Sequence, residues 1–194
     1  IPLGTRVRIP ELERRYNAVA QDDPMEKGRA PFSLVIGKVL GGHYETVTAS
    51  EAILRGGAYF APGVGDVVEV MADFRRSIDA ANAADPFLKV NPARIEFLHH
   101  DDSTRQSPQL PLAVHMCGTL GARGGKNTVH PGPFCCDMRH LVNQGGIPTI
   151  IFGPGTIAQA HKPDEHIALF EYADCIEHLI DFIWAWCNED AATV

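Results

Sequence analysis

The sequence predicts a mixed α/β protein made of two parts, and two patterns of apolar residues lead to this prediction. In the first part the pattern indicates a helix, two strands, a second helix and a third strand, in that order. In the second part helical patterns surround residues 147–152, a short β-branched run between two glycines that is typical of a strand buried on both faces. The parts meet near the polar residues 99–104, which predicts domains of residues 1–104 and 105–194.

The first elements are bounded by glycine and proline. Residues 11–20 carry the pattern of a helix end. Residues 31–40 are a predicted strand that stops at Gly41-Gly42, because paired glycines interrupt a strand. Residues 46–60 are predicted as the second strand, and Pro62-Gly63 ends it.

The remaining elements of the first part complete a recognisable order. Apolar residues recur at helical spacing from residue 64 to residue 83, and Asp85-Pro86 ends that predicted helix. Residues 93–98 alternate between apolar and charged side chains, which suits a third strand in the same sheet. This order is that of a ferredoxin-like βαββαβ sandwich that lacks its first strand.

The second part is predicted to be mainly helical. Helices are expected at residues 110–120, 137–143 and 167–187, and residues 127–133 are expected to form a short strand or a loop. The last helix carries an apolar stripe at helical spacing, which predicts that one face is buried in a core. The stripe consists of Ile176, Leu179, Ile180, Ile183, Trp184 and Cys187.

Composition limits the classes of function. The chain has 194 residues, of which 45% are hydrophobic, so it can bury a substantial core. Its formal net charge of -7 argues against a nucleic-acid partner, and no apolar run approaches the roughly 20 residues of a membrane-spanning helix. The five cysteines are an odd number without a CxxC spacing, which predicts reduced thiols and a cytoplasmic protein.

His161 is the strongest candidate for a functional residue. The predicted strand at residues 147–152 ends in the turn Gly153-Pro154-Gly155, and His161 follows within six residues of that turn. Pro163 disfavours a helical conformation for the residue before it, so the histidine is expected on a loop. Binding groups of open α/β sheets lie just beyond such strand ends, and a histidine there can face a cleft.

The run from Asp137 to Glu165 resembles the late signature of a family of zinc-dependent amidohydrolases and exopeptidases. That family includes acetylornithine deacetylase, succinyl-diaminopimelate desuccinylase, aminoacylase and bacterial glutamate carboxypeptidase. The matching motifs, in chain order, are Asp137-x-Arg139, Gly146-Ile147-Pro148, Gly153-Pro154-Gly155, Ala160-His161 and Pro163-Asp164-Glu165.

The resemblance implies a place for each part of the chain. In the family, a ferredoxin-like domain is inserted between two halves of the catalytic domain and acts as a lid and dimerisation surface. The first part resembles this lid from its middle onward, and the second part resembles the C-terminal segment of the catalytic α/β domain. The catalytic half that holds the general base would precede Ile1, so this chain alone is expected to be inactive.

The resemblance also implies a metal site and a reaction. His161 corresponds to the last ligand of a two-zinc centre, with cobalt or manganese as alternative metals, and binds through a neutral imidazole nitrogen. In the complete protein the metals activate a water and polarise an amide carbonyl, while a glutamate transfers the proton. The implied substrate is a small N-acyl amino acid or peptide, and the implied assembly is a homodimer formed through the lid.

Five residues correspond to substrate-binding positions. Asp137 and Arg139 lie at the rim of the family's substrate pocket, and a guanidinium there can hold a carboxylate by two hydrogen bonds. Gly153 and Gly155 would bring backbone groups beside the substrate, and Thr46 would approach it from the lid hairpin. For Arg139 a surface ion pair on a helix is an equally good interpretation.

Other interpretations of the same residues remain open. Cys135 or Cys136 could be the nucleophile of a cysteine hydrolase with His161 as base, although two small buried thiols are a simpler interpretation. Iodoacetamide should inactivate such an enzyme, whereas a chelator should inactivate a metal hydrolase. A third interpretation is a non-catalytic interaction module that dimerises through its first part.

Two further motifs are interpreted as structural. His99-His100-Asp101 has the residue order of the family's His-x-Asp ligand pair, but it follows the lid, whereas that pair precedes the lid. We therefore interpret it as a solvated turn. Residues 153–158 spell a dinucleotide-binding pattern, but Pro163 leaves no room for the helix that would hold a pyrophosphate.

Overall fold

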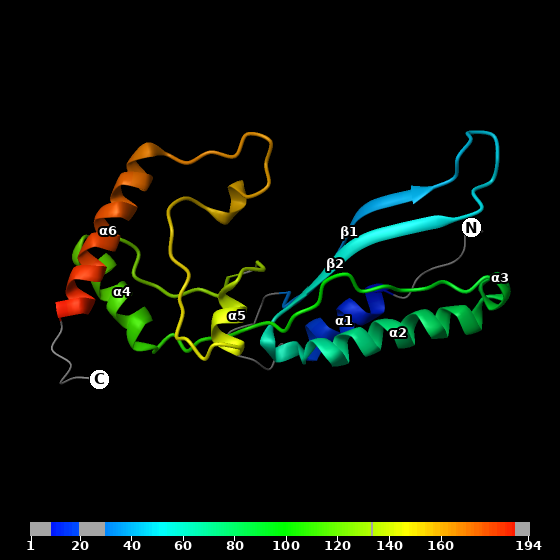
Figure 1. Ribbon diagram of the computed structural model, residues 1–194, viewed down its shortest axis with the longest axis horizontal. Helices are drawn as coiled ribbons and strands as arrows, with labels where there is room; N and C mark the ends of the chain where they lie inside the picture. The colour runs from blue at the N-terminus through cyan, green and yellow to red at the C-terminus, as the bar shows by residue number, and fades with distance from the viewer. Residues whose placement is uncertain (1–8, 20–29, 133, 189–194) are drawn as a thin grey trace. The chain divides into compact units, whose positions relative to one another are not determined.

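The computed structural model describes residues 9–19, 30–132 and 134–188 (Figure 1). The chain divides into two compact units, residues 1–105 and 106–194, and each is described by itself. Within the described part of the chain, no helix is long and apolar enough to cross a membrane. The structure is a mixture of helices and one small sheet, consistent with the predicted α/β class.

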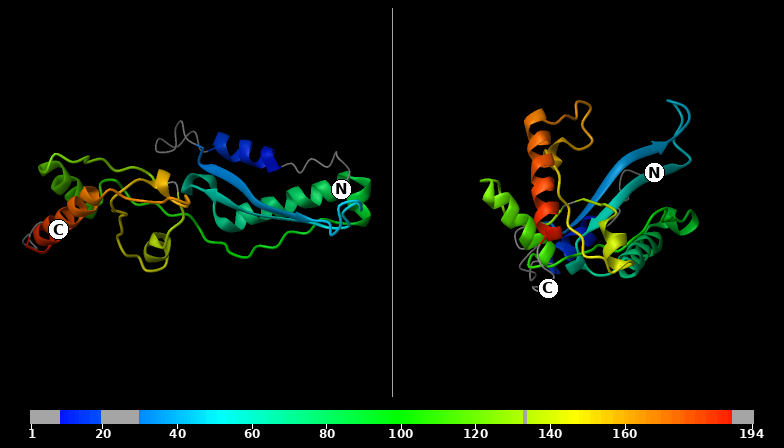
Figure 2. Two further views of the ribbon diagram at one scale, coloured as in Figure 1. Left: turned by 90° about the horizontal axis from the view of Figure 1, so that it is seen from above. Right: turned by 60° about the vertical axis from the view of Figure 1, so that its left-hand side comes forward.

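Unit 1 combines a β-hairpin with helices. Its elements are α1 (Ile9–Val19), β1 (Phe32–Gly41), β2 (Ala52–Phe60), the 3-10 helix η2 (Pro62–Val64), α2 (Val67–Ala84) and α3 (Pro86–Val90). Strands β1 and β2 pair antiparallel from Phe32 opposite Phe60 to Gly41 opposite Ala52. The hairpin and α2 run in the same general direction in both figures (Figures 1 and 2). The predicted helices and the hairpin are confirmed; the predicted end of the first helix at Ala20 lies outside the described residues.

The core of unit 1 forms around the first residue of β1. Phe32 is 0% exposed; its ring stacks on Tyr16 of α1 at 4.9 Å between centroids and lies 6.4 Å from the ring of Phe74 of α2. The side-chain amide of Asn17 both donates to the carbonyl of Phe32 (3.0 Å) and accepts from its N–H (2.9 Å). Asn17 therefore satisfies both backbone groups of Phe32, as a neighbouring strand would.

A buried carboxylate ties α1 to α2. Asp73 is buried and accepts a 2.5 Å hydrogen bond from the hydroxyl of Tyr16, while Arg15 and Arg76 form ion pairs with it. Burial raises the pKa of Tyr16, because its phenolate would be removed from water, and nearby Arg76 lowers it by a smaller amount. Tyr16 is thus held as a neutral donor to Asp73.

The hairpin contains one irregularity and one close approach. Ile36 pairs with Gly56 and Lys38 pairs with Arg55, so Gly37 is the extra residue of a β-bulge. At Gly56 a Cβ atom would lie 2.1 Å from the carbonyl oxygen of Val35. Gly56 is therefore required by the backbone approach, whereas a Cβ at Gly37 would have no neighbour within 4 Å.

The second strand begins later than predicted. Strand β2 starts at Ala52, six residues after the predicted start at Thr46, and Thr46 lies in the exposed turn that joins the strands. Gly42 opens this connection with a φ of 71°, a conformation that glycine adopts without strain. Residues 43–51 show no strict alternation of apolar and polar side chains, so they do not favour a ladder.

The predicted third strand at residues 93–98 is wrong as an assigned strand. Its alternation is present, since Ile95 and Phe97 are partly buried against the core while Arg94 and Glu96 are exposed. Asn82 bonds both backbone groups of Ala93, at 2.9 and 3.0 Å. Within the described residues, however, no strand lies beside this segment to receive its backbone hydrogen bonds, and a strand needs such a partner.

Unit 2 is built around two packed helices. Its elements are α4 (Pro111–Ala122), α5 (Met138–Asn143), the 3-10 helix η3 (Ile157–Gln159) and α6 (Leu169–Asn188). The ring of His115 on α4 packs edge-on against Phe182 and Trp186 of α6, at 5.4 and 5.5 Å. Arg123 binds Glu177 at 2.5 Å and also binds Asp181, and these two bonds raise its pKa. The three predicted helices are confirmed; residues 127–132 form a loop, and Pro133 is not described.

Residues 147–152 are extended but form no strand, contrary to the prediction. Ile147 and Ile151 are about half exposed. A strand buried on both faces requires neighbouring strands, and unit 2 offers none among its described residues. The composition of this run indicates a strand, but its hydrogen-bond partners are not in this unit.

The apolar stripe of α6 is also exposed, contrary to the prediction of a buried face. Trp184 is 72% exposed, and the other members of the stripe are exposed as well. Helix α6 instead packs on α4 through another face, which carries Phe182. The stripe has the spacing of a core surface, but no described element covers it.

Replacing Tyr16 by phenylalanine should destabilise unit 1 by roughly 1–3 kcal/mol at pH 7, because Asp73 loses a buried donor. Because the pKa of folded Tyr16 is raised, its contribution is complete below about pH 10 and is lost as pH rises through the folded value. Urea unfolding at pH 7 and above pH 10 measures both effects. The exposed Tyr44→Phe is the matched control, and an equal alkaline loss in Tyr16→Phe and the native chain would contradict this assignment.

Gly56→Ala should destabilise the hairpin by roughly 1–3 kcal/mol, because the added Cβ must displace the backbone of Val35. Gly37→Ala is the control in the facing strand and should be neutral or stabilising by up to about 1 kcal/mol. Urea unfolding followed by circular dichroism compares the two variants. Equal losses would mean that the close approach at Gly56 is not maintained in solution.

Candidate functional site

The candidate site begins where the extended run 147–152 ends. The turn Gly153-Pro154-Gly155 follows it, and Gly155 has a φ of 83°, in the left-handed region that favours glycine. The hydroxyl of Thr156 then accepts a 3.3 Å hydrogen bond from the N–H of Ala158 and caps η3. This short helix delivers the chain to His161, so the order strand-like run, turn and loop histidine is as predicted.

His161 has an unusual backbone conformation. Its φ is 63°, and among the described residues other than glycine it alone has a positive φ. Its N–H donates to the carboxylate of Glu165 at 3.2 Å, and the N–H of Glu165 donates to the carbonyl of Lys162, also at 3.2 Å. Such a conformation costs of order 1–3 kcal/mol in a residue with a side chain, and strained residues cluster at functional sites. The strain supports a functional interpretation of His161.

The residues present fit a single metal ligand, not a complete metal site. The side chain of His161 is exposed and offers a nitrogen donor of the type that zinc prefers. The other histidine of the loop, His166, is occupied with local contacts: its Nδ1 lies 2.6 Å from the carbonyl of Asp164, and its Nε2 lies 3.4 Å from Gln159. In the part of the chain that the structure describes, no three His, Cys, Asp or Glu side chains gather to hold a metal.

Asp137 and Arg139 lie at the start of α5. The carbonyl of Asp137 accepts hydrogen bonds from the N–H groups of His140 (2.9 Å) and Leu141 (3.3 Å). Arg139 donates through Nη1 to the sulfur of Cys135, which is an exposed free thiol, as Cys136 is a partly buried one. These contacts explain the local structure of the segment, and the substrate-binding role of both residues stays a prediction.

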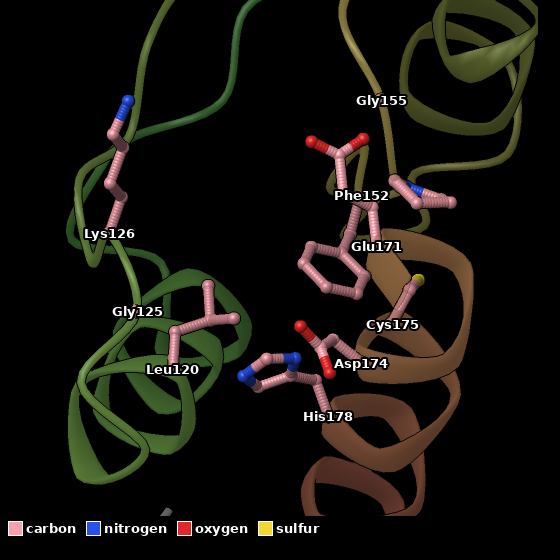
Figure 3. Close-up of a pocket in the computed structure, with 11 residues that line it drawn as sticks. Leu120, Gly125, Lys126, Phe152, Gly155, Glu171, Asp174, Cys175 and His178 are labelled. Atoms are coloured by element: carbon pink, nitrogen blue, oxygen red, sulfur yellow. The ribbon is translucent and has the colours of Figure 1, made fainter. Parts of the chain in front are cut away.

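Gly153 and Gly155 line a pocket of about 220 Å3 (Figure 3). The analysis of the sequence missed the polar residues of this pocket, which are Lys126 after α4 and Glu171, Asp174, Cys175 and His178 on α6. A signal for the α6 residues was present, since positions 171, 174, 175 and 178 share one face of a helix. His161 and Arg139 do not line this pocket.

The other predicted positions lie elsewhere. Thr46 belongs to the hairpin turn of unit 1, and its approach to a substrate stays a prediction. His99 and His100 are exposed, and the neighbouring Asp102 accepts a 2.6 Å hydrogen bond from the N–H of Val67 at the start of α2. That bond gives the polar run a structural role, and the exposure of His99 and His100 agrees with a solvated segment, but residues 99–104 do not form the predicted turn.

Comparison with known proteins adds independent information. Residues 16–185 match the model of peptidase family M20/M25/M40. Over 198 residues the chain is 38% identical to the N-formyl-4-amino-5-aminomethyl-2-methylpyrimidine deformylase of Halalkalibacterium halodurans. Over 189 residues it is 22% identical to the protein of the same name from Bacillus subtilis. Each match covers 93% of this chain and 44% of the relative, so the chain spans somewhat less than half the length of these proteins.

The geometry of His161 leads to a prediction for the chain by itself. A catalytic zinc takes about three protein ligands, and one exposed imidazole cannot hold it tightly against water and buffer. Calorimetric titration of the 194-residue chain with zinc should therefore give only weak binding, and His161→Ala should weaken it further. His166→Ala is the matched control from the same loop. Tight stoichiometric binding that depends on His161 would reveal further ligands and contradict the prediction.

Proposed function

The chain belongs to peptidase family M20/M25/M40, and we propose that it forms the C-terminal part of a metal-dependent amide hydrolase. It is part of a hydrolytic enzyme, as both the family and the deformylase relatives indicate. The observation that carries the proposal is the match over residues 16–185, which includes every motif from Asp137-x-Arg139 to Pro163-Asp164-Glu165.

For the substrate, we propose a small N-acylated amine. The relative that is 38% identical is named for removing a formyl group from an aminomethylpyrimidine, so that N-formyl amide is the first candidate. N-acyl amino acids and small peptides form the second class, because the same amide chemistry serves both. The two classes differ in the acyl group and in the amine that carries it, and a direct comparison of substrates distinguishes them.

The proposed role of His161 is to donate an imidazole nitrogen to a metal centre that the whole protein completes. A divalent metal such as zinc supplies Lewis-acid chemistry and activates water when it is bound. The N–H of His161 donates to the carboxylate of Glu165, and the backbone of His161 is in the left-handed region. No described residue is assigned as general base, and we propose that a glutamate outside this chain serves as one.

Exposed surfaces of unit 2 support the proposal of a larger catalytic domain. The run 147–152 has the composition of a doubly buried strand but no partner among the described residues, and the apolar stripe of α6 is uncovered. Backbone groups without protein partners must stay hydrated and cannot enter a core, and a large exposed apolar face is costly in water. Neighbouring strands and a covering layer from the remaining length of the protein would satisfy both.

Unit 1 has the features expected of the lid. The hairpin has a free edge on each strand, and residues 93–98 have the alternation of a strand without a ladder within the described residues. We propose that the ferredoxin-like sheet is completed by a first strand outside this chain. The whole protein would form a homodimer through this unit, and Thr46 would approach the substrate from the hairpin turn.

In the whole protein, His161→Ala should abolish amide hydrolysis and release one metal equivalent per active site, because the centre loses a direct ligand. His166→Ala should retain both activity and metal. Metal analysis together with assays on the N-formyl aminomethylpyrimidine and on N-acetyl amino acids gives the readout. Full activity in His161→Ala would contradict the proposal, whereas activity that survives a chelator but not iodoacetamide would contradict it and favour a cysteine hydrolase.

A further inference from the structure

One face of α6 is polar where most of the helix surface is apolar. Glu171, Asp174, Cys175 and His178 recur at the spacing i, i+3, i+4, i+7, and all four line the pocket beside the Gly-Pro-Gly turn. This stripe is separate from the exposed apolar stripe of the same helix. A helix that only packs against a core has no need of two carboxylates and an imidazole on one face.

The opposite side of the pocket carries a positive charge. Lys126 follows the end of α4, and in the close-up it extends on the other side of the gap from Glu171 (Figure 3). Leu120 and Phe152 supply apolar surface between these charges. The pocket therefore has an acidic wall, a basic wall and an apolar floor.

Within the described part of the chain, these charged groups form no ion pairs with one another or with their surroundings. Among the described residues, neither Glu171 nor Asp174 nor Lys126 forms an ion pair of 4.0 Å or less. The Nε2 of His178 is buried and forms no hydrogen bond within the same part of the chain. A Cβ at Gly125 would lie 3.8 Å from this nitrogen, so residue 125 packs closely beside it.

The volume of the pocket and the chemistry of its side chains indicate which class of ligand it can bind. The volume of about 220 Å3 is below the roughly 300–1,000 Å3 of pockets for drug-sized ligands, so the occupant must be small. The carboxylates, thiol and imidazole are metal-ligand types, but they do not converge as a metal site among the described residues. Opposite charges on opposite walls instead complement a molecule that carries both charges.

We propose that this pocket binds a small zwitterion, an α-amino acid with a short apolar side chain. Its ammonium group is held by Glu171 and Asp174, and its carboxylate is held by Lys126 through charge-assisted hydrogen bonds. The side chain lies on Leu120 and Phe152. The proposal does not rest on metal binding or hydrolysis, so its failure would leave the proposed hydrolase function untouched.

The test is titration of the 194-residue chain with L-valine, followed by the backbone amide NMR signals of Gly125, Gly153 and Gly155. Saturable shifts of these signals are expected in the millimolar range. Isobutyrate and isobutylamine each present one of the two charges and should bind roughly ten-fold more weakly, a factor that corresponds to about 1.4 kcal/mol. Equal binding of either single-charge probe, or no saturation at tens of millimolar valine, would overturn the proposal.

Variants test the two walls separately. Lys126→Met and Asp174→Asn should each weaken valine binding roughly three- to ten-fold, a modest factor because both side chains are exposed and screened by solvent. Lys162→Met removes an exposed lysine that does not line the pocket and is the matched control. Circular dichroism verifies that each variant is folded, and isobutyrate binding to Asp174→Asn verifies that its basic wall is intact. Unchanged valine affinity in either wall variant would overturn the assignment of that wall.

Discussion

The requirement that backbone N–H and C=O groups find hydrogen-bond partners governs both units of this chain. Strands β1 and β2 satisfy it by pairing with each other, and Asn17 and Asn82 satisfy it with side-chain amides at Phe32 and Ala93. The segments 93–98 and 147–152 have strand-like sequences and extended backbones but no ladder among the described residues. The two departures from the predicted sheet therefore have one cause, which is the lack of a neighbouring strand.

In the absence of further strands among the described residues, each unit forms a core only where its own elements enclose apolar side chains. In unit 1, Phe32 is enclosed because α1 and α2 meet at the base of the hairpin, and the buried Asp73 joins these helices through Tyr16, Arg15 and Arg76. Farther along the hairpin, side chains such as Val39, at 67% exposed, have nothing to pack on. In unit 2, α4 covers one face of α6 and leaves its apolar stripe exposed. Exposed apolar surfaces such as these mark interaction sites. They agree with a chain that spans 44% of the length of its relatives.

The strongest candidate functional residues lie in the segment that follows residues 147–152. The Gly-Pro-Gly turn borders a pocket with charges of both signs, and the loop beyond it holds His161 in a strained conformation through Glu165. Residues strained in this way cluster at functional sites, and this is the reason that His161 is the candidate residue of the loop. Membership of peptidase family M20/M25/M40 gives this geometry its chemical meaning, because the family hydrolyses peptide and amide bonds.

The sequence by itself determined the family, the helices, the hairpin and the candidate histidine. These features depend on local signals: the spacing of apolar residues, the glycines and prolines that end elements, and the order of motifs from Asp137 to Glu165. Tertiary structure alone decided which strand-like segments are paired, which face of α6 is covered, and that Lys126 faces the acidic stripe of α6 across a pocket. The physical reason is that pairing and burial depend on residues far apart in the sequence, whereas periodicity and turn chemistry are properties of each segment alone.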